Sequence, residues 1–238
     1  MSRKQKIDRP KANKKETQAD IVFCIDSTGS MAPCIRKVKS GIRAFADGLQ
    51  EAANVDFRLR MIAYRDLHDP TAQGDPPWKS TSFTRSVEEF RDGLSEISAE
   101  GGGDYRGAES TLDVLYRAIQ SDWRAHETHK TIVLLTDDDT HDELHGSTYD
   151  KPDNGVRRVI QEFQTLRHAM LFMVAPDYPA YQKLEEAMED ADRKIFARFV
   201  PRDEERYEGL REVPIESLLE MIGKTVSRTT VKIARQKD

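Results

Sequence analysis

The sequence predicts an α/β fold: a doubly wound, mainly parallel central sheet flanked by helices. Two observations carry this prediction. Short apolar segments rich in β-branched residues alternate, along most of the chain, with longer segments whose apolar residues recur at helical spacing. The apolar segments are also nearly uninterrupted, as strands are when both faces of a parallel sheet are covered. We therefore expect successive strand–helix–strand units within one sheet.

The first predicted strand is the apolar run Ile21–Ile25, which ends abruptly at Asp26. Small residues follow, and Gly29 supplies the freedom that a tight turn into a helix requires. Apolar residues recur at helical spacing from Met31 to Leu49, which predicts a long first helix. A carboxylate therefore lies on a loop at the carboxyl end of a buried strand.

The remaining elements continue the alternation. Ser86 and Glu89 form a capping-box pattern where the second helix is expected to begin. The further predicted strands are 57–64, 78–83 (a short edge strand), 131–136, 169–175 and 195–200. The further predicted helices are 87–97, 112–119, 156–166, 184–191 and 215–226.

The chain of 238 residues is long enough for one such domain with a full core. We expect residues 1–18 to be a disordered basic tail, because this polar segment cannot bury apolar area. Residues 19–228 are predicted to form the domain, and residues 229–238 a frayed C-terminal tail. The sequence contains no visible internal repeat or second domain boundary.

Composition and charge limit the classes of partner. The 37 basic and 42 acidic residues give a net charge of −5, which favours neither nucleic acid nor a membrane as a partner. No apolar run approaches the ~18 residues that a membrane span needs, and the N-terminus lacks the apolar core of a secretory signal. We therefore expect a cytoplasmic protein, with Cys24 and Cys34 as thiols of the core.

The loop after the first strand carries three oxygen side chains at alternate positions: Asp26, Thr28 and Ser30. These are hard donors of the kind that Mg²⁺ or Ca²⁺ selects. Ligands of open α/β sheets bind at the carboxyl ends of the strands, where the strand order reverses. If the first strand is central and 131–136 lies beside it, Asp26 and Asp137 meet at that point.

This pattern resembles the metal-ion-dependent adhesion site (MIDAS) of the von Willebrand factor A (vWA) domain family. The usual form is Asp-x-Ser-x-Ser, and Thr28 keeps the hydroxyl of the first serine. Two later segments extend the resemblance to about residues 19–225. Gly101–Gly103 followed by Asp104 is similar to the second loop of intracellular members, and Leu135-Thr136-Asp137 is similar to the third. The departure is after Asp104, where the matching acid, Glu109, comes two residues later than in relatives.

The resemblance implies a Rossmann-like vWA fold with one metal site formed by Asp26, Thr28, Ser30, Asp104 and Asp137. The expected cofactor is Mg²⁺, with Mn²⁺ or Ca²⁺ as alternatives. Thr28 and Ser30 would bind the ion directly, while Asp26 and Asp137 would hold metal-bound waters and orient the hydroxyls. Asp104 would bind directly or through water.

The implied function is a non-enzymatic protein–protein interaction module. One coordination position would stay open for an Asp or Glu of a partner protein. Intracellular members of the family often work beside kinases, phosphatases or ATPases, which suggests a multi-protein signalling, stress-response or defence system. Neither a nucleic-acid nor a membrane partner is expected.

The alternative function is a Mg²⁺-dependent phosphohydrolase. An enzyme of the haloacid-dehalogenase type needs Asp-x-Asp, and here Thr28 stands where the second acid would protonate the leaving group. No Walker lysine follows the three glycines, which disfavours nucleotide hydrolysis of that type. A response-regulator receiver domain is disfavoured by the chain length and by the hydroxyls of the first loop.

Each motif also has a simpler interpretation. Asp26 alone could cap a helix, Asp137 to Asp139 alone could be a solvated turn, and Gly101–Gly103 alone could be a linker. The segment His141-Asp-Glu-Leu-His145 resembles a zinc-protease motif, which requires both histidines on one face of a helix. Here it lies in a polar loop, so solvated loop histidines are the preferred interpretation.

Overall fold

The computed structural model describes residues 17–51, 55–68, 78–99, 108–125, 127–149, 154–187, 190, 192–200 and 210–235. The strands are β1 (Thr17–Asp26), β2 (Val55–Tyr64), β3 (Trp78–Ser80), β4 (Ala108–Glu109), β5 (His129–Leu135), β6 (Asp139–Thr140), β7 (Ala169–Pro176) and β8 (Arg193–Val200). The helices are the 3₁₀ helix η1 (Gly29–Met31) and the α-helices α1 (Ala32–Gln50), α2 (Val87–Ser95), α3 (Thr111–Ile119), α4 (Gly155–Phe163), α5 (Pro179–Ala187) and α6 (Ile215–Arg235).

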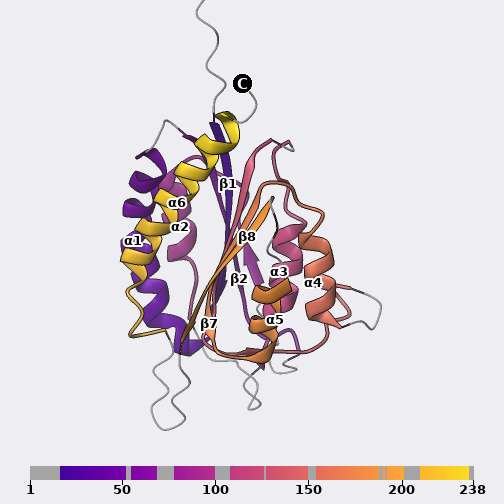
Figure 1. Ribbon diagram of the computed structural model, residues 1–238. Helices are drawn as coiled ribbons and strands as arrows, with labels where there is room; N and C mark the ends of the chain where they lie inside the picture. The colour runs from indigo at the N-terminus through magenta and orange to yellow at the C-terminus, as the bar shows by residue number, and fades with distance from the viewer. Residues whose placement is uncertain are drawn as a thin grey trace, which may run out of the picture.

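A six-stranded sheet in the order β3-β2-β1-β5-β7-β8 forms the centre of the molecule (Figure 1). Its neighbouring strands are parallel except for β2 and β3, which are antiparallel. Helices α1, α2 and α6 lie on one face, and α3, α4 and α5 lie on the other (Figure 1). The predicted fold class is therefore confirmed.

Strand β1 lies between β2 and β5 and supplies side chains to both cores. Ile21, Phe23 and Ile25 pack under α1 and α6, whereas Val22 and Cys24 point to the core beneath α3 and α4. All five side chains are fully buried. This two-sided burial explains why the segment is apolar without interruption, and it makes the strand a rigid support for the loop that follows Asp26.

Helices α1 and α6 approach each other closely on their face of the sheet. A Cβ atom added at Gly223 in α6 would lie 2.4 Å from the backbone oxygen of Phe45 in α1. Such a distance is inside van der Waals contact, so this crossing requires a glycine.

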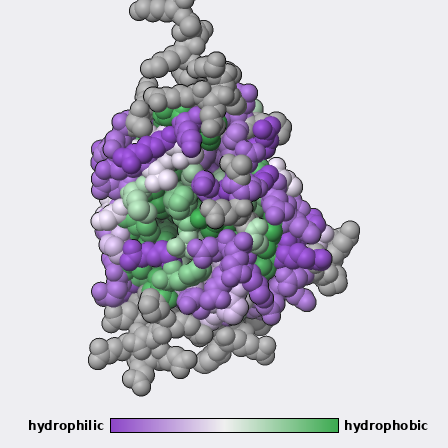
Figure 2. Space-filling view, viewed as in Figure 1, coloured by the Kyte–Doolittle hydropathy of each residue, from purple (hydrophilic) through white to green (hydrophobic). Residues whose placement is uncertain are grey.

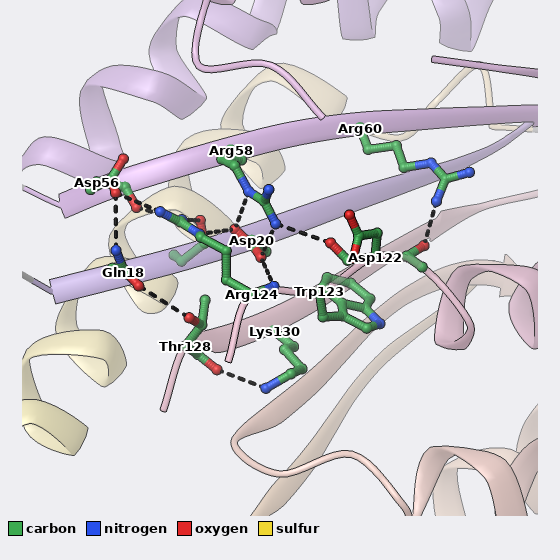
Figure 3. Close-up of polar contacts among 12 residues, drawn as sticks. Gln18, Asp20, Asp56, Arg58, Arg60, Asp122, Trp123, Arg124, Thr128 and Lys130 are labelled. Carbon is green, nitrogen blue, oxygen red and sulfur yellow. Dashed lines mark hydrogen bonds and ion pairs between the residues drawn. The ribbon is translucent and has the colours of Figure 1, made fainter. Parts of the chain in front are cut away.

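An ion-pair network joins β1, β2 and the segment after α3 (Figure 3). The side chain of Asp20 is fully buried and accepts hydrogen bonds from the Nε and NH2 groups of Arg58, at 3.0 and 2.7 Å. It also accepts from the backbone N–H and Nε of Arg124, at 2.8 and 2.7 Å. Arg124 bonds to Asp56 as well. The network ties three separate segments together, Asp20 being six positions before the strand end at Asp26.

The structure differs from expectation in several places: α5 begins at Pro179 instead of 184, β3 ends at Ser80 instead of 83, and the limits of the domain and one strand pair also differ. Strand β1 starts at Thr17, inside the expected tail of residues 1–18, and residues 1–16 lie outside the described part of the chain. Helix α6 continues to Arg235 instead of fraying after 228, because the buried side chain of Thr230 extends its packed face. The short parallel pair β4–β6 was not predicted.

Two smaller findings complete the fold. Cys24 and Cys34 are buried free thiols, as predicted. Among the described helices, none combines the length and apolar character that crossing a membrane demands.

Candidate functional site

The first loop of the candidate site follows β1 and is held by hydrogen bonds to the end of β2 and by hydrogen bonds within the loop. The backbone N–H and the hydroxyl of Ser27 both donate to the Tyr64 carbonyl, each at 2.9 Å, which fixes the loop to the end of β2. Asp26 Oδ1 accepts from the N–H and the hydroxyl of Thr28, at 2.9 and 2.7 Å. The hydroxyl oxygens of Thr28 and Ser30 lie 3.2 Å apart. Three predicted site residues therefore converge.

The third loop meets the first at the crevice between β1 and β5. The hydroxyl of Thr136 donates to Asp26 Oδ2 at 3.2 Å. Asp137 follows, with only 1% of its surface exposed, and neither of its carboxylate oxygens has a hydrogen-bond partner among the described residues. The strand order thus brings Asp26 and Asp137 to one place, as the sequence predicted.

The second loop is only partly described. Gly101–Gly103 and Asp104 lie outside the described residues, so the structure does not place that predicted ligand. The described part resumes at Ala108, where β4 pairs with β6 and Glu109 lies opposite Thr140. Glu109 is 2% exposed, and its Oε2 has no hydrogen-bond partner among the described residues. Glu109 is therefore a candidate ligand that was not among the five predicted.

Burial raises the pKa of all three acids, and neighbouring carboxylates raise each of them further. Burial and the neighbouring Asp137 raise the pKa of Asp26 to about 7. Burial, with a contribution from Asp138, raises the pKa of Asp137 to about 6 against the opposing effect of the nearby Ser30 hydroxyl. Burial and Asp26 raise the pKa of Glu109 to about 10. A bound cation would stabilise all three ionised carboxylates, which is the electrostatic requirement of a cation site.

The donor set suits a hard divalent cation only when the hydroxyls are counted. Within the described residues, no three His, Cys, Asp or Glu side chains are grouped so that they could hold a metal ion by themselves. An ion at these loops would depend on the hydroxyls of Thr28 and Ser30 and on the second loop. Hydroxyl and carboxylate oxygens fit Mg²⁺ and do not fit a soft metal.

The histidines of the third loop differ from expectation. His141 and His145 do not lie on a helix, so the zinc-protease arrangement is absent from this described segment. They are not freely solvated either: His141 Nε2 lies 2.8 Å from Oδ1 of the buried Asp66. The His68 ring contacts both, with centroids 4.1 Å from His141 and 4.9 Å from His145. The cluster connects the loop after β2 to the third loop.

The mainly parallel, doubly wound sheet defines an α/β domain, and the oxygen side chains of Asp26 and Asp137 lie at its switch point, where such sheets in general bind ligands. The model of the von Willebrand factor type A domain matches residues 20–211, and the chain belongs to that family. It is also 28% identical over 137 residues to the alpha-protein kinase vwkA of Dictyostelium discoideum. That match covers 57% of this chain and 21% of the kinase, so the chain spans about a fifth of that relative.

Solved structures share the fold at low sequence identity. The SpaC pilus adhesin of Lactobacillus rhamnosus GG, in its open conformation, has a TM-score of 0.55 and 13% identity, over 91% of this chain and 31% of the adhesin. A von Willebrand factor type A protein of Catenulispora acidiphila has a TM-score of 0.51 and 15% identity, over 89% and 43%. The VWA domain of SpRpn10 has a TM-score of 0.53 and 10% identity, over 84% and 93%.

Proposed function

We propose that this chain binds a partner protein by gripping an Asp or Glu of the partner through a divalent cation, Mg²⁺ first and Mn²⁺ or Ca²⁺ as alternatives. VWA domains are in general protein-interaction modules. The observation that carries the metal-dependent part is the buried carboxylate of Asp137, which lies near Asp26. Neither oxygen of this carboxylate has a hydrogen-bond partner among the described residues. Leaving such oxygens unsatisfied costs free energy unless a cation or water bonds to them.

The residues of the proposed site would have different roles toward the ion. Thr28 and Ser30 would bind the ion directly through their hydroxyl oxygens, and Ser30 is exposed, so the ion would face the outside. Asp26 keeps the Thr28 hydroxyl oriented through the 2.7 Å hydrogen bond. Asp137 and Glu109 would supply negative charge from the buried side of the ion, and Asp104 would be the remaining residue of the site. When bound, the cation would offer an open position to a carboxylate oxygen.

The conditional nature of the contact follows from charge. Without a cation, the ionised Asp137 and the partly ionised Asp26 would repel a partner carboxylate at neutral pH, while Glu109, with a pKa of about 10, would be protonated and neutral. With a cation, that carboxylate gains a favourable partner, so the sign of the interaction reverses. The kinase vwkA, which this chain matches over part of its length, supports a setting in a multi-protein signalling system, although stress-response or defence systems fit the same chemistry.

We further propose that the domain has no hydrolytic activity. The hydroxyl of Thr28 donates to Asp26, and no acid stands at position 28 to protonate a leaving group. Any weak phosphatase signal should therefore persist in Asp26→Ala as a contaminant. A turnover that disappears with this substitution would favour the phosphohydrolase alternative.

The binding proposal is tested by affinity capture in parallel with Mg²⁺ and with chelator. Wild type, Ser30→Ala and a control, Ser95→Ala, would be immobilised; Ser95 is an exposed hydroxyl at the end of α2. Wild type and the control should retain a partner only with Mg²⁺, and Ser30→Ala should lose it. The captured partner should then depend on one Asp or Glu that Asn or Gln cannot replace. Capture that neither chelator nor Ser30→Ala changes would place the contact elsewhere.

A further inference from the structure

The outer edge of the sheet is formed by β8, at the opposite end of the strand order from β3. Strand β8 pairs with β7 along its whole length, from Ala169 opposite Arg193 to Pro176 opposite Val200. In the described part of the chain, no strand pairs with its other side. A sheet edge of eight residues presents a row of backbone hydrogen-bonding groups to a potential partner.

The orientation of these backbone groups follows from one hydrogen bond. The N–H of Ala169 donates to the Asp192 carbonyl at 3.1 Å, so even-numbered residues of the parallel strand bond to β7 and odd-numbered residues turn outward. At Arg193 the outward groups are occupied, because its N–H donates to Asp190 Oδ1 and its carbonyl accepts from the Asp190 N–H. The open stretch therefore runs from Ile195 through Ala197 to Phe199.

The side chains of β8 alternate in a regular way. Lys194, Phe196 and Arg198 are exposed on the face that carries α1 and α6, while the residues between them are half-buried against the other core. Phe196 is 41% exposed and stacks on Phe172 of β7, with ring centroids 4.9 Å apart.

The exposure of Phe196 has a simple cause. The helices on its face pack over β1, β2 and β5, and the aromatic ring on β8 lies beyond them. Figure 2 shows apolar residues gathered in the middle of this view, where β8 lies in Figure 1. An aromatic ring flanked by two cations, beside an open backbone edge, is a chemically specific surface.

Charge decides between the possible occupants. In an antiparallel pair of two copies centred on Phe196, Lys194 of each copy would lie opposite Arg198 of the other, and like charges directly opposite are destabilising. Both cations are exposed to solvent. The edge therefore disfavours self-association and favours a segment of opposite charge.

We propose that the open edge of β8 accepts an extended segment of a partner protein as an added strand. The segment carries Asp or Glu opposite Lys194 and Arg198 and an apolar residue opposite Phe196. Backbone hydrogen bonds to Ile195, Ala197 and Phe199 provide affinity, and the alternating side chains provide specificity. This contact requires no cation, so it is separate from the metal-dependent function and can be tested in chelator.

The probe is a synthetic, end-blocked peptide of sequence Thr-Asp-Val-Phe-Val-Glu-Thr, titrated to millimolar concentration into the ¹⁵N-labelled full chain with chelator present. The expected result is saturable shifts in the amide signals of Ile195, Ala197 and Phe199, and slower hydrogen exchange at these three amides. A control peptide with Lys in place of Asp and Glu should bind about tenfold more weakly or not at all.

Variants of exposed residues provide the matched controls. The double variant Lys194→Glu/Arg198→Glu should exchange the preference, binding the Lys peptide and rejecting the acidic one. A second double variant, Arg36→Glu/Arg91→Glu, makes the same change of charge at exposed positions of α1 and α2 and should behave like wild type. Phe196→Ala should weaken the binding of the acidic peptide.

Three outcomes would overturn the proposal. The first is the absence of shifts along β8 at saturating peptide. The second is protection of the Ile195, Ala197 and Phe199 amides in the free protein, which would mean that the chain covers its own edge. The third is a dimer detected by light scattering, together with β8 shifts that disappear when the protein is diluted. That result would identify a second copy of the chain as the occupant.

Discussion

Removing the buried carboxylate of Asp20 should be among the most destabilising single changes in this domain. Asp20 is fully buried and accepts four hydrogen bonds from Arg58 and Arg124. The side chains of these arginines are only 18% and 14% exposed. Asp20→Ala removes the carboxylate that both arginines share, where water has little access to replace it. Arg124 keeps its ion pair with Asp56.

The expected cost is about 3–5 kcal/mol, the range for breaking one partner out of a buried ion pair. That is a large share of the roughly 5–15 kcal/mol that stabilises a typical domain. The control is Arg43→Ala, which removes a pair with Glu88 in which both side chains are about 70% exposed. An exposed pair of this kind contributes less than about 1 kcal/mol.

The assay is urea denaturation of wild type, Asp20→Ala, Arg124→Ala, Arg43→Ala and the double variant Asp20→Ala/Arg124→Ala. The double variant should lose less stability than the sum of its single variants, because removing both partners leaves fewer unpaired charges. If Asp20→Ala unfolds at nearly the same midpoint as Arg43→Ala, the network contributes little and the argument from burial is refuted.

Three further predictions follow from the core and the site. Gly223→Ala should cost about 1–3 kcal/mol, because its Cβ would meet the Phe45 oxygen, whereas Gly146→Ala, with open space around it, should be nearly neutral in the same denaturation assay. Burial lowers the pKa of His129 to about 3, so below an ordinary His pKa of about 6.5 the unfolded chain binds a proton that the folded chain refuses. The stability that neutral His129 contributes is therefore complete above about pH 6.5 and declines as the pH falls toward 3. Between pH 7.5 and 5, the free energy of unfolding of wild type should fall by about 2 kcal/mol more than that of His129→Leu. An equal fall in the two proteins would contradict this. Chelator should leave the domain folded, lowering the melting temperature only by lost ligand linkage, and global unfolding in chelator would show that the fold needs the ion.

The parts that the sequence predicts well are those with a periodic signal. Uninterrupted apolar runs located β1 and β5, and the acids that end them, Asp26 and Asp137, followed from the strand order. Thr28 and Ser30 were predicted as site residues because an alternating pattern of oxygen side chains stands directly after β1, and the structure places their hydroxyl oxygens 3.2 Å apart.

The parts that the sequence does not predict depend on contacts between distant positions. Glu109 is positioned by β4 and β6, a pair too short to leave any periodicity, and the sequence offered only the resemblance of this acid to the one in the family's second loop. His141 contacts Asp66, which lies 75 positions earlier, and no local pattern reveals that pairing. Arg124 is 104 positions from Asp20, so the network that they share emerges only in the folded chain.

The central claim is that the loops after β1, before α3 and after β5 form one divalent-cation site. Calorimetric titration of Mn²⁺ into wild type, Asp26→Ala and Asp47→Ala tests it most directly, since Asp47 is an exposed acid of α1 outside the loops. Wild type and Asp47→Ala should each bind one ion per chain, and Asp26→Ala should bind it at least about tenfold more weakly. Equal binding by all three proteins, or no binding by wild type, would contradict the claim.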